Sequence, residues 1–167
     1  MIKHIECDVF KAGADFVLHQ VNCQGVMGSG VAKQVRDKYP IVFEKYKEKC
    51  DKHNPRNLLG KAQYVGTYIE YETEFLGIFN LFAQEKYGYD GKCYTDYDSL
   101  KECLEMVAES IRGVNNSLSA KEDQLRKIAI PYLMGCHRGG GCWKTVIKII
   151  EDTLEGFDVL ICKYNGG

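Results

Sequence analysis

The sequence predicts an α/β protein arranged as a three-layer α/β/α sandwich around a mixed sheet. Short apolar segments typical of strands alternate along the chain with segments whose apolar residues recur at helical spacing. Phe16–Val21 is apolar enough to be a central strand that is covered on both faces. The polar segment Glu70–Glu74 separates two further expected strands, Ala62–Ile69 and Phe75–Phe82, and indicates a hairpin turn. We therefore expect one antiparallel pair in a sheet whose other strands alternate with helices.

The N-terminal half follows this pattern from its first residues. In order, the expected elements are a strand at 2–6, a connection at 11–15, the strand at 16–21, a helix marked by Val31, Val35 and Tyr39 and ended by Pro40, a helical segment marked by Val42, Tyr46 and Cys50, and a loop at 53–57. A glycine-rich loop separates the second strand from the first helix.

The C-terminal half repeats the alternation. The expected elements are a Tyr- and Gly-rich loop at 86–96, a helix marked by Leu100, Leu104, Val107, Ile111 and Val114, a loop or frayed helix end at 115–124, a strand at 128–133, a helix from Trp143 with Val146, Ile147, Ile150 and Leu154, and a strand at 158–163. Thr95 and Asp98 resemble a capping box at the start of the first of these helices.

Length and charge limit the possible classes of protein. The 167 residues suit one domain spanning 1–167, and the net charge of -1 argues against a nonspecific nucleic-acid binder. No segment is apolar enough to span a bilayer, and the N-terminus lacks the pattern of a signal peptide. We expect a cytoplasmic monomer without membrane association. The eight cysteines, none in a CxxC pair, are then mostly reduced core residues.

Two glycine-rich loops, Gly25–Gly30 and Gly135–Gly141, each follow an apolar strand and precede a helix. Backbone N–H groups in such loops can turn toward one anion, and a helix N-terminus adds positive potential. Two such loops at one sheet edge can clamp a diphosphate, whereas the simpler alternative is a pair of tight turns. The spacing matches neither a P-loop nor a dinucleotide-binding fingerprint.

Polar residues near these loops are candidates for recognition or chemistry, and each has a structural alternative. Asn22 suits a sugar diol or loop stabilisation, and His19 suits acid–base work or a structural role. His137 and Arg138 suit phosphate binding or a solvent-facing position. Further candidates are Asp8 for the amine of a base or for a turn, and Tyr164 for base stacking. Cys136, His137 and Cys142 match no standard zinc motif, so no metal is expected.

These residues together resemble the macrodomain family. The likeness lies in His19–Ala32 with Asn22-Cys23, Met27-Gly28 and Gly30-Val31-Ala32, in Cys7-Asp8-Val9-Phe10, in Gln84, and in Pro131 through Gly135-Cys136 to Gly139-Gly140-Gly141 and Trp143. It covers nearly the whole chain in order. Within the family, the chain is most similar to the branch of terminal ADP-ribose protein glycohydrolase and the ADP-ribose-1''-phosphate phosphatases.

The resemblance implies a mixed six-stranded sheet with ADP-ribose bound across its crest and no cofactor. It implies that Asp8 holds the adenine amine, that Tyr164 stacks on adenine, and that Asn22 approaches the distal ribose. It also implies that Val9 is a ligand-binding position. The remaining ligand-binding positions that it implies are Gln20, Met27, Gly28, Ser29, Gly30, Val31, Gln84, Gly135, Cys136, His137, Arg138, Gly139, Gly140, Gly141 and Cys142.

The chain departs from the family pattern at positions that concern chemistry. Similar glycohydrolases have a Lys where this chain has Gln84, and Lys86 lies two residues on. Some have an Asp where Gly139 stands, and His137 replaces a common Gly. His19 matches a catalytic candidate of the phosphatase-like members. The catalytic candidates are accordingly His19, Asn22 and Lys86.

Three hypotheses follow from the residues and the resemblance. The first is a hydrolase that acts at the C1'' end of the distal ribose of an ADP-ribosylated macromolecule, ADP-ribose-1''-phosphate or O-acyl-ADP-ribose. In it His19 acts as acid or base, or positions water, directly or through Asn22. The second is a non-catalytic ADP-ribose reader. The third, an RNA- or poly(A)-binding module, is disfavoured by the nearly neutral charge.

Overall fold

The computed structural model describes residues 1–68, 75–121 and 124–165. Its elements are β1 (Ile2–Glu6), the 3-10 helix η1 (Val9–Lys11), β2 (Phe16–Asn22), α1 (Gly30–Lys38), α2 (Pro40–Lys52), α3 (Pro55–Leu58), β3 (Ala62–Tyr68), β4 (Phe75–Gln84), α4 (Tyr97–Ser117), β5 (Lys127–Pro131), α5 (Trp143–Thr153) and β6 (Asp158–Lys163). The expected alternation of strands and helices is confirmed.

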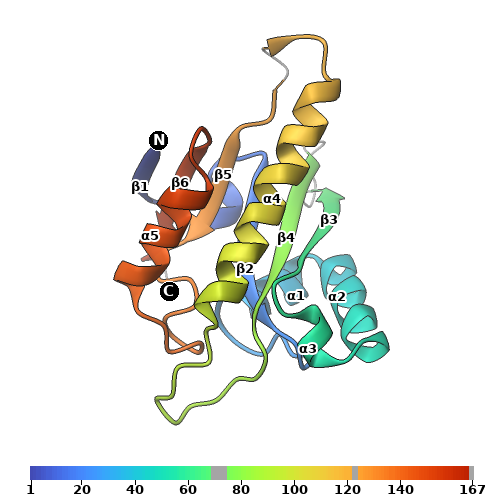
Figure 1. Ribbon diagram of the computed structural model, residues 1–167, viewed down its shortest axis with the longest axis vertical. Coiled ribbons are helices and arrows are strands. Elements are labelled where there is room, and N and C mark those ends of the chain that lie inside the picture. The colour runs from blue at the N-terminus through green and yellow to red at the C-terminus, as the bar shows by residue number, and fades with distance from the viewer. Residues whose placement is uncertain (69–74, 122–123, 166–167) are drawn as a thin grey trace.

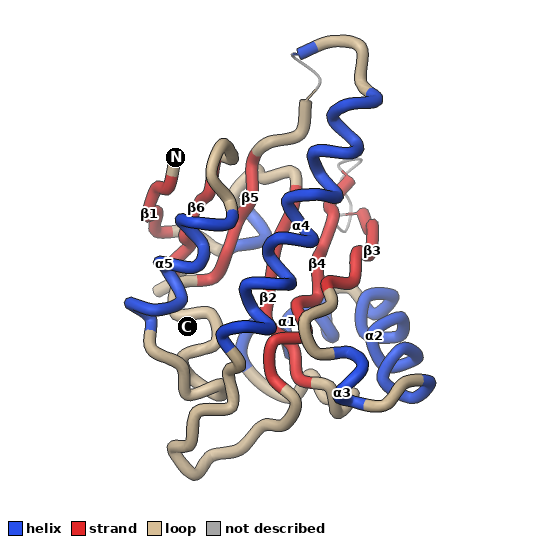
Figure 2. The backbone as a smooth tube through the Cα atoms, viewed as in Figure 1, coloured by secondary structure: helices blue, strands red, loops and turns tan. Residues whose placement is uncertain are grey.

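The six strands form one sheet in the order β1-β6-β5-β2-β4-β3. β3 is antiparallel to β4, and the other neighbouring strands pair in parallel. This arrangement confirms the expected mixed six-stranded sheet with one antiparallel pair. Figure 2 shows the strands between two sets of helices, with β1 and β3 at opposite edges.

Helices cover both faces of the sheet (Figure 1). α4 and α5 lie across one face, and α1 and α2 lie on the other. The alternation of side chains along β2 supplies both layers. Phe16 and Leu18 belong to the buried cluster that includes residues of α4 and α5, whereas Val17 and Val21 belong to the cluster that includes residues of α1 and α2. β2 is therefore the central strand that its apolar sequence predicts.

Two parallel strands diverge at the centre of the sheet. β2 pairs with β4 along its whole length, but it pairs with β5 only at Phe16–Ile128 and Val17–Ala129. Beyond these pairs, the carboxyl ends of β2 and β5 have no ladder between them. In open α/β sheets, ligands bind in a crevice of this kind outside the strand ends.

Several boundaries differ from the expectation. Pro40 occupies the first position of α2, where its missing N–H costs no helical hydrogen bond, and α1 ends at Lys38. The expected loop at 53–57 contains the start of α3, which Asn54 caps by accepting a hydrogen bond from the Arg56 N–H at 3.0 Å. β5 ends at Pro131 instead of residue 133, and the expected turn at 70–74 lies outside the described residues.

The capping box expected at Thr95 is wrong. Asp96 caps α4, because its Oδ1 accepts a hydrogen bond from the Ser99 N–H at 3.0 Å. Thr95 instead donates its hydroxyl to the Gly135 carbonyl at 2.7 Å. Thr95 thus joins the start of α4 to the second glycine-rich loop. Among the described helices, none combines the length and the apolar character needed to cross a membrane.

Candidate functional site

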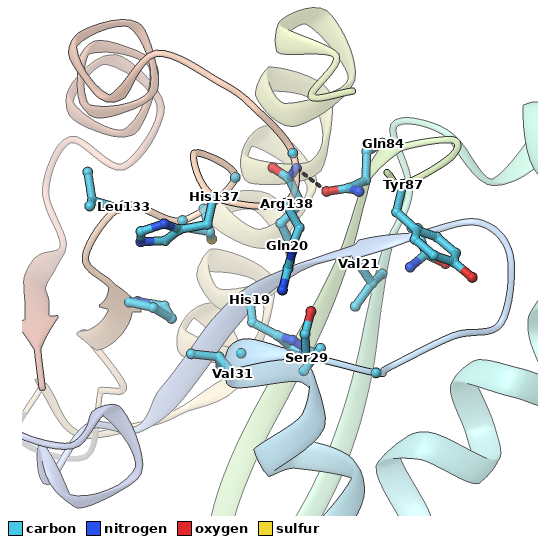
Figure 3. Close-up of a pocket in the computed structure, with 18 of the residues that line it drawn as sticks. His19, Gln20, Val21, Ser29, Val31, Gln84, Tyr87, Leu133, His137 and Arg138 are labelled. Carbon is cyan, nitrogen blue, oxygen red and sulfur yellow. Dashed lines mark hydrogen bonds between the residues drawn. The ribbon is translucent and has the colours of Figure 1, made fainter. Parts of the chain in front are cut away.

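A continuous cleft runs along the carboxyl ends of β2, β5 and β6. It consists of two adjoining cavities that share lining residues from α1 and from the segment after β5. The first cavity lies at the end of β2, and Figure 3 shows its lining. The second extends to Asp8, Val9 and Tyr164. The divergence of β2 and β5 accounts for this position, because no backbone ladder closes the space between their ends.

The first glycine-rich loop supplies backbone N–H groups to this cleft that have no acceptor among the described residues. Ser29 precedes α1 as its N-cap but makes no side-chain capping hydrogen bond. The first backbone bond of the helix runs from the Lys33 N–H to the Ser29 carbonyl at 3.2 Å, which leaves the Gly30 and Val31 N–H groups outside the helical ladder. Gly28, Ser29, Gly30 and Val31 all line the first cavity. A helix N-terminus with free N–H groups is a site for an anion.

The second glycine-rich loop faces the first across the cavity. Gly135, His137, Arg138 and Gly139 line it. Among the described residues, no acceptor is paired with the backbone N–H groups of His137, Arg138 or Gly139. Gly135 has a φ of +76°, and a Cβ there would lie 2.6 Å from Gln20 Oε1. The loop therefore requires glycine at this position both for its backbone conformation and for its approach to β2.

An aromatic side chain holds the guanidinium of this loop. The Arg138 Cζ lies 3.8 Å from the ring centroid of Tyr89, and both residues line the first cavity. Stacking of this kind fixes the orientation of a cation without removing its charge. Arg138 and Tyr89 are both exposed, so the charge stands at the mouth of the cavity. This position suits an anionic part of a ligand.

His19 forms part of the cavity lining from β2 and is almost fully buried, with 2% of its surface exposed. Its Nε2 lies 2.5 Å from Asn80 Oδ1, while its buried Nδ1 has no hydrogen-bond partner among the described residues. Burial lowers the pKa of the imidazole from 6.5 to about 4, against the opposing effect of the Asn80 hydrogen bond. His19 is therefore neutral at pH 7, and its unprotonated ring nitrogen can accept a hydrogen bond.

Gln20, the next residue of β2, connects the second loop to β4. Its Nε2 donates to Gln84 Oε1 at 2.8 Å and to Thr95 Oγ1 at 2.9 Å, and Gln84 Nε2 donates to the Lys86 carbonyl at 3.0 Å. The Gln20 Oε1 atom is buried and has no partner among the described residues. Gln20 and Gln84 line the cavity as expected, and the unpaired Gln20 Oε1 lies against Gly135.

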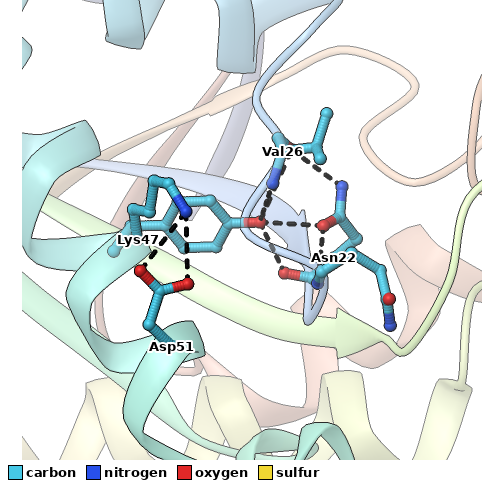
Figure 4. A network of polar contacts seen from close by, with 6 residues as sticks. Asn22, Val26, Lys47 and Asp51 are labelled. Carbon is cyan, nitrogen blue, oxygen red and sulfur yellow. Dashed lines mark hydrogen bonds and ion pairs between the residues drawn. The ribbon is translucent and has the colours of Figure 1, made fainter.

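Asn22 holds the first loop in place (Figure 4). Its Nδ2 donates to the Val26 carbonyl at 2.8 Å, and its Oδ1 accepts from the Gln24 N–H at 2.9 Å. The Tyr46 hydroxyl also lies 2.8 Å from Asn22 Oδ1. Of the two alternatives for this residue, loop stabilisation is therefore the one that the structure shows. Asn22 also lines the first cavity, and one amide N–H remains for a ligand.

The far end of the cleft contains the residues expected near a base. Asp8 caps η1 through its Oδ1, which accepts from the Phe10 N–H at 2.9 Å, while its Oδ2 lies 3.5 Å from the Lys38 Nζ. Tyr164 is 57% exposed at the end of β6. Asp8, Val9 and Tyr164 line the second cavity together.

Several expected site residues do not line either cavity. Lys86 is exposed, and the part of it that reaches Gln84 is its backbone carbonyl, because the chain leaves the sheet after β4. Its assignment as a catalytic residue therefore has no support from its position. The other expected residues outside the lining are Met27, Cys136, Gly140, Gly141 and Cys142.

Packing explains the position of these residues. Met27 is a core side chain with 1% exposure, and Cys136 is half-buried against the core of the α4 and α5 layer. A Cβ on Gly140 would collide with the Lys92 carbonyl, so this glycine accommodates the neighbouring loop. Cys142 is exposed as the N-cap of α5, where its N–H donates to the Tyr97 hydroxyl at 2.9 Å.

Other lining residues were not expected from the sequence. They are Val21, Val26, Ala32, Gln34, Tyr87, Tyr89, Pro131, Tyr132, Leu133, Met134, Cys162, Lys163 and Asn165. Leu133 has a φ of +61°, which is rare for a residue with a side chain and marks a strained turn at the cleft. The Tyr-rich composition of 86–96 was a signal for Tyr87 and Tyr89. Among the described residues, no cluster of His, Cys, Asp and Glu could hold a metal ion.

Comparison with known proteins found a matching family model and several similar proteins. A family model described as "Macro domain" matches residues 18–150. ADP-ribose 1''-phosphate phosphatase of Aspergillus fumigatus is 42% identical over 66 residues, which are 38% of this chain and 30% of that protein. DNA ADP-ribosyl glycohydrolase of Thermus aquaticus is 25% identical over 162 residues, which are 95% of this chain and 39% of that protein. The chain thus spans about a third of the length of these curated relatives.

A solved structure has the same fold. Thermosipho africanus DarTG in complex with ADP-ribose superposes with a TM-score of 0.73 at 20% identity, over 97% of this chain and 41% of that one. The family model extends from β2 to α5 and includes both glycine-rich loops and the first cavity. The expected family is therefore confirmed, and the chain belongs to the Macro domain family.

Proposed function

We propose that this macrodomain binds ADP-ribose conjugates and hydrolyses them at the C1'' end of the distal ribose. The observation that carries the proposal is the arrangement of the cleft. A subsite with Asp8 and Tyr164 at one end of the cleft continues, past two loops whose N–H groups have no acceptor among the described residues, to His19 at the other end. This sequence of base site, anion site and sugar site corresponds in order to adenosine, diphosphate and distal ribose.

Binding rests on backbone and aromatic groups. Gly30 and Val31 line the same cavity as His137, Arg138 and Gly139, and the backbone N–H groups of these residues have no acceptor among the described residues. The Arg138 guanidinium adds a full positive charge. A diphosphate between these groups accepts charge-assisted hydrogen bonds from both sides. The complex of the Thermosipho africanus relative with ADP-ribose supports this choice of ligand.

The chemistry rests on His19. A neutral imidazole with an unpaired Nδ1 accepts a proton from water as the water oxygen bonds to C1''. The bond from C1'' to the conjugated oxygen or nitrogen breaks, and the departing atom takes a proton from solvent. Nδ1 returns its proton to solvent, and ADP-ribose and the conjugate partner are released. Because the pKa of His19 is about 4, a base or water-positioning role is favoured over a general-acid role at neutral pH. The names of the phosphatase and glycohydrolase relatives support hydrolysis.

A non-catalytic reader of ADP-ribose is the second candidate. Two observations favour it: Lys86 is exposed outside the cleft, and the second glycine-rich loop contains no acidic residue. Such a reader binds ADP-ribose through the same loops but turns over no conjugate.

A panel assay distinguishes the two candidates. The substrates are ADP-ribose-1''-phosphate, O-acetyl-ADP-ribose, and ADP-ribose linked to glutamate, serine or a nucleobase. Hydrolysis of at least one by wild type, with loss of turnover and retention of ADP-ribose affinity in His19→Ala, supports the hydrolase. The Lys86→Ala variant should retain activity. Binding without turnover of any substrate supports the reader, and absence of calorimetric binding of ADP-ribose contradicts both.

A further inference from the structure

A row of polar side chains crosses three strands beneath the first cavity. His19 of β2, Asn80 of β4 and Gln63 of β3 stand side by side, because the strand register pairs His19 with Asn80 and Asn80 with Gln63. His19 Nε2 lies 2.5 Å from Asn80 Oδ1, and Asn80 Nδ2 lies 3.1 Å from Gln63 Oε1. Gln63 Nε2 lies 3.1 Å from the backbone carbonyl of Lys45 in α2. The row thus connects the cavity to α2, which packs on the same face of the sheet.

The carbonyl at the end of the row fixes the direction of every hydrogen bond in it. A carbonyl only accepts, so Gln63 must present its amide N–H to Lys45 and its Oε1 to Asn80. Asn80 must then donate from Nδ2 and present Oδ1 to His19. His19 must donate from Nε2. A neutral imidazole has a single N–H, so Nδ1 carries a lone pair.

The Nδ1 lone pair has no partner among the residues that the structure describes. Its atom is buried, makes no hydrogen bond to any described residue, and belongs to a side chain that lines the cavity. Leaving such an acceptor unpaired is costly, and a ligand hydroxyl or a bound water that donates to it removes this cost. A ligand group without an N–H or O–H donor leaves the acceptor unpaired.

We propose that Asn80 and Gln63 are positioning residues that hold His19 as the Nε2–H tautomer, so that Nδ1 accepts a hydrogen bond from a distal-ribose hydroxyl or from the attacking water. The identity of the donor rests on the proposed function, whereas the tautomer does not. The low pKa of the buried ring agrees with a neutral imidazole that is ready to accept.

The tautomer is measured directly by NMR of protein containing ¹⁵N-labelled histidine. Wild type should show protonated Nε2 and unprotonated Nδ1 at His19 at pH 7. In Gln63→Met the side chain keeps its length but loses the acceptor, which frees the Asn80 amide to turn and present Nδ2. The His19 proton should then move, at least in part, to Nδ1. Gln63→Glu keeps an acceptor for Asn80 Nδ2, so the wild-type tautomer should return.

Turnover provides the second measurement. On whichever conjugate wild type hydrolyses, Gln63→Met should lower kcat by at least about tenfold, toward the 10²–10⁴-fold that general-base catalysis contributes. KM should stay within about twofold, and Gln63→Glu should recover most of the kcat. Thr67→Val is the matched control, because Thr67 lies on the same face of β3 and makes no side-chain bond to this row. It should change neither the tautomer nor kcat.

The outcomes separate this proposal from the proposed function. A wild-type His19 protonated at Nδ1 overturns the proposal whatever the activity, and so does a loss of kcat in Gln63→Met with an unchanged tautomer. If wild type hydrolyses no conjugate, the proposed function fails, and ADP-ribose becomes the probe. A shift of the His19 Nδ1 resonance on saturation with ADP-ribose, absent from Gln63→Met, then supports the proposal, and no shift in wild type overturns it.

Discussion

The hydroxyl oxygen of Tyr46 lies 2.8 Å from the backbone carbonyl oxygen of Asn22 and 2.8 Å from its side-chain Oδ1. The same hydroxyl accepts a hydrogen bond from the Val26 N–H at 3.1 Å. One buried side chain of α2 therefore holds the end of β2 and the first glycine-rich loop together. Burial also raises the pKa of Tyr46 above its ordinary value, so the hydroxyl keeps its proton.

Loss of this hydroxyl should loosen the first loop. Tyr46→Phe leaves the Asn22 and Val26 groups without their partner, so the free energy of unfolding should fall by about 1–3 kcal/mol. ADP-ribose affinity should fall with it, because the loop that lines the cavity is held less firmly. Urea denaturation and calorimetry measure the two effects. Tyr64→Phe is the control, since the Tyr64 side chain is 47% exposed and its hydroxyl makes no hydrogen bond to any described residue. Equal losses in both variants would contradict the role of Tyr46.

The two glycine-rich loops should respond differently to added side chains. Gly28 lines the cavity, and a Cβ there would meet only the Val26 side chain at 3.6 Å. Gly28→Leu should therefore fold normally and lose ADP-ribose affinity. Gly140 has a φ of +64° and faces the Lys92 carbonyl, so Gly140→Ala should lower the free energy of unfolding by at least about 1–2 kcal/mol. Thermal denaturation and calorimetry on both variants check this difference, and a destabilised Gly28→Leu would refute it.

The charge of Arg138 should matter more than its bulk. Arg138→Gln removes a charge-assisted hydrogen bond worth roughly 1.5–3 kcal/mol, so ADP-ribose affinity should fall by about tenfold or more. Arg138→Lys keeps the charge but loses the stacking on Tyr89, and it should give an intermediate affinity. Calorimetry at two salt concentrations measures the ADP-ribose affinity of each variant. The affinity should depend less on salt in Arg138→Gln than in wild type. Arg112→Gln, whose guanidinium lies over Phe157 outside the cleft, should bind as wild type does.

The neutral state of His19 should make stability depend on pH. The folded pKa of about 4 lies below the ordinary value of 6.5, so the unfolded chain binds the proton first as the pH falls. This contribution to stability is fully present above pH 6.5 and is lost between pH 6.5 and pH 4, by an amount of order 3 kcal/mol. Urea denaturation at several pH values gives the free energy of unfolding as a function of pH. This free energy should change less with pH in His19→Gln than in wild type. His53→Gln, an exposed control, should show the same pH dependence as wild type.

The pattern of residues along the sequence was sufficient to predict the sheet and both glycine-rich loops. The apolar run in Phe16–Val21 requires a strand covered on both sides, and glycines after a strand end permit a loop with free N–H groups. These are local properties, and the structure confirms them. Gln20, Gly28–Val31 and Gly135 accordingly line the cleft as expected.

Contacts between residues far apart in the sequence decided which other residues line the cleft and which side chain pairs with His19. Lys86 and Gly140 are near cleft residues in sequence, but the end of β4 and the contact with Lys92 place them outside the lining. Asn80, a polar side chain in the interior of the apolar strand β4, was a signal that a buried partner exists, but the partner could not be identified locally. His19 and Asn80 are 61 positions apart. The sequence by itself determined where the strands and the two glycine-rich loops lie, and it made His19 a catalytic candidate. Only the tertiary structure decided the direction of its hydrogen bonds, because the register of β2, β4 and β3 brings the donors and acceptors together.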